Sequence, residues 1–129
     1  MEHFEEFTLE GKSFVCIDLS KLKNTTDLVA MTEATKPLIA SYPKNSLHTI
    51  TNVAGIMFDS ESKYVLANYM KHNKNYVKAG VIIGIDGIKK AVAGSAAKVA
   101  GRINMHYAFT RDQAVALLLE ESSEEHLFH

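Results

Sequence analysis

This chain has little of several features that commonly point to a function. Its 129 residues include one cysteine, Cys16, so no internal disulfide can form, which suits a reducing compartment. The formal net charge of −1 gives no overall attraction to nucleic acid or to an anionic membrane. No apolar run reaches the ~20 residues of a membrane span. A secretory signal has a basic start followed by an apolar segment, and the sequence shows no such pattern. We therefore expect a cytoplasmic protein.

Motifs for catalysis, nucleotide binding and metal binding are also lacking. The spacing of Gly80, Gly84 and Gly87 is G-x-x-x-G-x-x-G, which matches neither the dinucleotide fingerprint nor the P-loop. There is no G-x-S-x-G elbow for a serine hydrolase, and no H-x-x-x-H or C-x-x-C pair for zinc. We therefore expect a protein that is not an enzyme and that binds no metal and no cofactor.

What is present is the composition of an ordinary globular protein. Hydrophobic residues make up 47% of the chain and charged residues 22%. A chain of this length buries enough surface to fold without a disulfide or a metal. We expect one domain over residues 1–129. The acidic, polar C-terminal segment is predicted to fray from about residue 121.

Segments with strand and helix patterns alternate along the chain. The predicted strands cover residues 4–11, 12–20, 46–53, 77–85 and 103–109, and the predicted helices cover residues 27–42, 60–72, 88–101 and 111–121. Pro37 predicts a kink or a late helical segment within the first helix. The order ββαβαβαβα predicts an α/β fold with a mixed, mostly parallel five-stranded sheet flanked by helices. Because the second strand is apolar on both faces, we expect it inside the sheet.

The first candidate site is the start of the second helix, at Asp59, Ser60 and Ser62. Serine at a helix start is most often only a capping residue. A phosphate at the same position acts strongly, because its charge meets the positive end of the helix dipole. We therefore treat these residues as a candidate phosphorylation and docking site.

The second candidate site is the predicted start of the third helix, at Gly87, Lys89 and Lys90. Lysine is unfavourable in the first turn of a helix, and a bound phosphate or carboxylate would relieve that conflict. The alternative is that both lysines simply point into solvent. The same helix is rich in alanine, which favours close packing, a self-association face in a homodimer, or the floor of a groove for an apolar ligand.

With this element order and the Asp59-Ser60 loop, the chain resembles the STAS family, and more closely its SpoIIAA-like branch of small bacterial proteins. The passages HNKNYVKAGVIIGIDGIKK and VAGRINMHYAFTRDQAVALLL look typical of that branch. The resemblance implies a protein that works by binding. In the signalling members, a serine in a D-S-x-G-like loop is phosphorylated and thereby switches partner binding. Asp59 and Ser60 match that loop, whereas Ser62 stands where glycine is expected.

Two functions follow from these observations. The favoured one is a cytosolic regulatory or interaction module with a protein partner, switched by phosphorylation or by an anion near the second helix. The other is a small carrier that holds an apolar or acidic, lipid-like ligand between helices and sheet, with Lys89 and Lys90 at the mouth. The SpoIIAA-like branch is similar in fold to small lipid-binding CRAL-TRIO domains, which implies such a ligand as an alternative.

Overall fold

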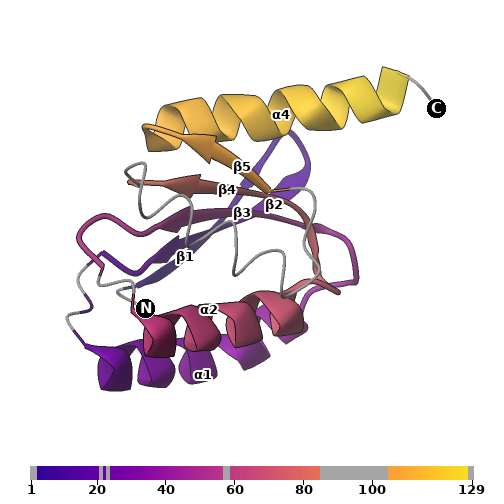
Figure 1. The fold of residues 1–129 in the computed structure, drawn as a ribbon. Helices are drawn as coiled ribbons and strands as arrows, with labels where there is room; N and C mark the ends of the chain where they lie inside the picture. The colour runs from indigo at the N-terminus through magenta and orange to yellow at the C-terminus, as the bar shows by residue number, and fades with distance from the viewer. Residues whose placement is uncertain (1–2, 21, 23, 57–58, 85–104, 128–129) are drawn as a thin grey trace.

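A five-stranded sheet runs through the middle of the molecule, with helices on both of its faces (Figure 1). The computed structural model describes residues 3–20, 22, 24–56, 59–84 and 105–127. The strands are β1 (Phe4–Leu9), β2 (Lys12–Asp18), β3 (Leu47–Asn52), β4 (Val77–Ile83) and β5 (Met105–Ala108). They lie in the sheet in the order of the sequence. β1 pairs antiparallel with β2, and all other neighbours are parallel.

The helices divide between the two faces. Helices α1 (Thr25–Ala40) and α2 (Ser60–Asn73) pack against each other on one face, and α4 (Arg111–Leu127) packs on β3, β4 and β5 on the other (Figure 1). The strand order explains the first pair. The β2–α1–β3 and β3–α2–β4 crossovers advance in the same direction along the sheet, and crossovers share one hand. Both helices therefore fall on the same side.

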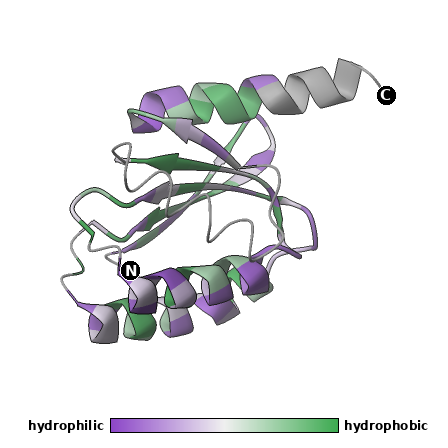
Figure 2. Ribbon diagram, viewed as in Figure 1, coloured by the Kyte–Doolittle hydropathy of each residue, from purple (hydrophilic) through white to green (hydrophobic). Residues whose placement is uncertain are grey.

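Strand β2 contributes side chains to two separate hydrophobic clusters. Val15 and Ile17, with Leu19 just after the strand, pack with α1 and α2, whereas Phe14 and Cys16 belong to the cluster under α4. The sequence prediction that β2 is apolar on both faces and interior to the sheet is confirmed. Figure 2 shows hydrophobic residues concentrated in the strands, while α1 and α2 mix hydrophobic and hydrophilic positions.

The predicted fold class is confirmed: the chain forms one α/β domain around a mixed, mostly parallel five-stranded sheet. The predicted helix over residues 88–101 lies outside the described residues. Helix α1 is one continuous segment, although Pro37 suggested a kink. Pro37 is exposed and near the end of the helix, where a single missing backbone bond is tolerated. Helix α4 extends to Leu127, and fraying of the tail from about residue 121 stays a prediction.

Candidate functional site

The carboxyl ends of the parallel strands lie together along one edge of the sheet, where β2 ends at Asp18 and β3 ends at Asn52. Each of these side chains folds back on its own loop. Asp18 Oδ1 accepts hydrogen bonds from the Ser20 amide at 2.9 Å and from the Ser20 hydroxyl. Asn52 Oδ1 accepts from the Ala54 amide at 3.0 Å. Both loops are therefore tight side-chain-stabilised turns.

The end of β4 lies against the second of these turns. Gly84 has a φ of +77°, and a Cβ added there would lie 2.6 Å from Asn52 Oδ1 and 2.8 Å from the Ala54 amide nitrogen. Glycine is thus required both by the backbone conformation and by the space. Gly87, Lys89 and Lys90, the predicted anion site, lie outside the described residues, so that site stays a prediction.

The loop after β3 leads into α2 through a capping box. Asp59 is the N-cap, and its carboxylate accepts a hydrogen bond from the Ser62 amide at 2.8 Å. In return, the Ser62 hydroxyl accepts from the Asp59 amide at 2.9 Å. The hydrogen bond from the Ser62 backbone lowers the pKa of the Asp59 carboxyl below its usual value. Two of the free N–H groups at the helix start are satisfied in this way.

The two serines of the predicted site are therefore in different situations. Ser62 is only 3% exposed and its hydroxyl is part of the capping box. Ser60 is exposed at the first position of α2. The serine that stands where the resemblance expects glycine serves to cap the helix, and it leaves the Ser60 side chain at the surface.

The rest of α2 is packed against the core on its inner side and exposed to solvent on its outer side. The Tyr69 hydroxyl lies 2.6 Å from the Thr35 hydroxyl of α1, and burial raises the pKa of Tyr69 to about 12. Leu66 and Met70 are buried in the same cluster. Tyr64, one turn beyond Ser60, is 73% exposed. Residues four apart lie on one helix face, so Ser60 and Tyr64 share a surface.

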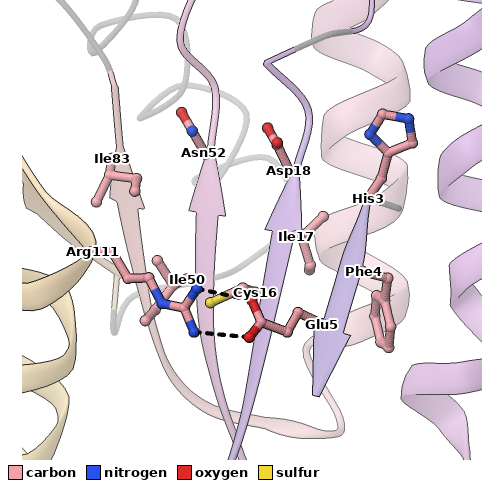
Figure 3. Close-up of a pocket in the computed structure, with 10 residues that line it drawn as sticks. All are labelled: His3, Phe4, Glu5, Cys16, Ile17, Asp18, Ile50, Asn52, Ile83 and Arg111. Atoms are coloured by element: carbon pink, nitrogen blue, oxygen red, sulfur yellow. Dashed lines mark hydrogen bonds and ion pairs between the residues drawn. The ribbon is translucent and has the colours of Figure 1, made fainter. Parts of the chain in front are cut away.

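Sequence reasoning missed a cavity at the same edge of the sheet, on the α4 face. This edge cavity has a volume of about 220 Å³. Its lining includes Asp18, Asn52, His3, Cys16, Ile50, Ile83, Glu5 and Arg111 (Figure 3). The polar ends of Asp18 and Asn52 fall on this face because strand side chains alternate. That alternation was the available signal in the sequence.

Arg111, at the start of α4, reaches across the sheet to the edge strand β1. Its Nη1 and Nη2 atoms donate to the two Glu5 carboxylate oxygens at 2.8 and 3.1 Å (Figure 3). The guanidinium also lies 5.0 Å from the centre of the Phe7 ring. The bond to Arg111 lowers the pKa of Glu5. These partners are 106 residues apart in the sequence, so no local pattern indicates their contact.

The histidines and the cysteine of the strands lie on the α4 side of the sheet. His48 pairs with Ala79 and His106 with Val81, so both histidines face the α4 side. Cys16 is half-buried at the edge cavity, and burial raises the pKa of its thiol. Among the described residues there is no group of three or more side chains suited to a metal. No helix in the described part of the chain is long and apolar enough to cross a membrane.

Comparison with known proteins gives a likeness to solved structures. No family model matches the chain, and no curated protein matches it. Among solved structures, it is similar to an anti-sigma-factor antagonist (STAS) domain protein from Planctomyces limnophilus, with a TM-score of 0.48 and 10% sequence identity. The match covers 89% of this chain and 97% of the other. That protein is of the kind the sequence motifs resemble, and at this level of similarity the likeness transfers no function.

Proposed function

We propose that this protein is a non-enzymatic regulatory module that acts by binding another protein through the start of α2. The docking surface consists of Asp59, Ser60, Glu61 and Tyr64. One observation carries the proposal: Ser60 is exposed at the first position of a helix that Asp59 and Ser62 already cap. The hydroxyl of Ser60 is not needed for the cap, so it is available to a partner or a kinase.

The surface around Ser60 suits both recognition and switching. Tyr64 offers an exposed aromatic ring on the next turn, and exposed tyrosine is a common anchor in protein interfaces. The inner side of α2 is fixed to the core by Leu66, Tyr69 and Met70. A partner would therefore meet a rigid surface and would lose little free energy in ordering it.

Phosphorylation of Ser60 would change the charge of this surface strongly. A phosphate adds about two negative charges beside Asp59 and Glu61, which are already acidic. The N-terminal N–H groups of α2 and the helix dipole favour that charge, so the helix should persist. The expected consequence is an altered partner affinity with little change in fold.

The carrier alternative has little room in the part of the helix–sheet layer that the structure describes. Between the sheet and α2, the cavity bordered by Leu66, Tyr69 and Met70 has a volume of about 30 Å³. That is roughly the volume of one water molecule, whereas ligand pockets usually measure about 300–1,000 Å³. The described part of this layer is filled by side chains, which favours the docking module.

The test begins with a photo-crosslinking amino acid at position 64 in the native host. Position 8, exposed on the edge strand β1, is the control. A discrete protein joined from position 64 but not from position 8, identified by mass spectrometry, is the expected result. Phosphopeptide mapping of the same material then tests for a phosphate on Ser60.

The captured partner is next titrated against purified variants. Ser60→Glu should change its affinity about tenfold or more, because it adds charge inside the contact. Gln113→Glu adds the same charge at the start of α4, on the opposite face, and should leave affinity unchanged. If no protein is joined at position 64, or if both variants bind as the wild type does, the docking proposal fails.

A further inference from the structure

The edge cavity contains an unbalanced charge. Three charged side chains line it: Glu5, Asp18 and Arg111. Glu5 and Arg111 neutralise each other through two hydrogen bonds. Asp18 accepts only from the neutral Ser20, and no cationic side chain of the described residues pairs with it. The described lining therefore has a net negative charge, located at Asp18.

The polar groups of the cavity gather around the same carboxylate. Asn52 stands beside Asp18 in the strand register and uses its oxygen for the Ala54 amide, which turns its Nδ2 group to other partners. On the other side of Asp18, the His3 Nδ1 atom is buried and lacks a hydrogen-bond partner among the described residues. Asp18, Asn52 and His3 lie in one row at the ends of the strands (Figure 3).

Apolar side chains also line the cavity. Cys16 and Ile50 occupy adjacent positions on β2 and β3, one row further into the sheet, where Glu5 stands beside Cys16. Ile83 on β4 stands beside Asn52, in the same row as Asp18. A ligand would thus meet the Asp18 carboxylate and the aliphatic side chains of Ile50 and Ile83. Small-molecule sites commonly combine an apolar lining with a few polar groups of this kind.

We infer that the edge cavity binds a small organic cation, namely a primary amine with an aliphatic body. The ammonium group lies at Asp18, and the body lies against Ile50 and Ile83. The cavity volume of about 220 Å³ equals roughly seven water molecules, which admits a short branched amine. The site is on the face of the sheet opposite α2, so the inference does not rest on Ser60 or on the docking surface.

Anions are the natural competitors, and the lining argues against them. Arg111 is the cation of the lining, and both Glu5 oxygens already occupy it. A carboxylate entering the cavity would have to displace Glu5 while it approaches Asp18. The sign of the charge on the ligand is therefore the property that an experiment should vary.

Three compounds with the same branched carbon skeleton vary that charge: isopentylamine, isopentanol and isovalerate. Each is titrated into the ¹⁵N-labelled full chain at neutral pH and constant salt, and backbone amide shifts are followed. Isopentylamine should shift the amides of Cys16, Asp18 and Asn52 with a Kd on the order of 1 mM. The alcohol and the acid should bind about tenfold more weakly or not at all, because neither forms a charge-assisted hydrogen bond with Asp18.

Two variants locate the effect. Asp18→Asn keeps the shape and the acceptor for Ser20 but removes the charge, so amine affinity should fall about tenfold. Glu10→Gln removes one negative charge at the distant β1–β2 turn and should change affinity by less than about twofold, because salt screens distant charges. Ser60→Glu should leave amine binding unchanged whether or not it alters partner binding.

The inference is overturned by any of three results. These are isovalerate binding as tightly as the amine, unchanged amine affinity in Asp18→Asn, or no shift of the cavity amides with any of the compounds. If Asp18→Asn does not fold, the comparison of the three compounds on the wild type decides the question.

Discussion

The two faces of the sheet are covered differently, although they share the same strands. On one face, two helices pack side by side and leave space of about 30 Å³. On the other, among the described helices, α4 alone packs on the sheet, over β3, β4 and β5. The Glu5–Arg111 pair and the edge cavity lie toward β1 and β2 on that face. Where two helices pack on the sheet, their side chains fill the layer, whereas the cavity lies on the face where α4 is the one described helix.

The largest effect should be the difference in stability lost when one side chain is truncated on each face of the sheet. Leu19 is fully buried under α1 and α2, whereas Cys16 is half-buried at the edge cavity. Leu19→Ala should lower the free energy of unfolding by about 3 kcal/mol, because it leaves a void in a packed layer. Cys16→Ala should cost about 1 kcal/mol or less, since its site already borders a cavity. Urea denaturation of both variants measures the difference, and equal losses would mean that the two faces are packed alike.

A smaller effect should separate the two serines at the start of α2. Ser62→Ala removes the buried acceptor for the Asp59 amide and should cost about 1 kcal/mol of stability. Ser60→Ala removes an exposed hydroxyl outside the capping box and should change stability by less than about 0.5 kcal/mol. Thermal unfolding of the two variants checks this order. A Ser60→Ala variant as unstable as Ser62→Ala would show that Ser60 has a structural role.

The smallest effect should come from the ion pair beside the edge cavity. The side chains of Arg111 and Glu5 are 48% and 56% exposed, so solvent screens their attraction. Arg111→Gln should cause a slight loss of stability that disappears at high salt. Because Arg111 holds the pKa of Glu5 below its usual 4.5, the contribution is present above that pH and is lost as the pH falls further.

The measurement is the difference in melting temperature between the wild type and Arg111→Gln at several pH values and salt concentrations. Lys36→Gln provides a comparison on the opposite face, where Lys36 pairs with Glu33 but is less exposed, at 16%, and also donates to Asn68. A difference for Arg111→Gln that grows below pH 4.5 would contradict the pairing.

Much of the fold could be predicted because its determinants are local. The period-two pattern of residues 13–19 placed β2 inside the sheet, and Asp59 with Ser60 marked the start of α2. The exposure of Ser60 could not be predicted in this way, since it depends on Ser62 taking the capping role. In the sequence, Ser62 was noted because it departs from the D-S-x-G-like loop, and its part in capping α2 was not predicted.

By itself, the sequence determined the alternation of strands and helices, the apolar faces of β2 and the start of α2, because each depends on residues within a few positions of one another. Only the tertiary structure decided that Asp18 and Asn52 stand side by side and that Arg111 reaches Glu5. The order of strands in the sheet brings these residues together, and that order depends on packing between segments far apart in the chain.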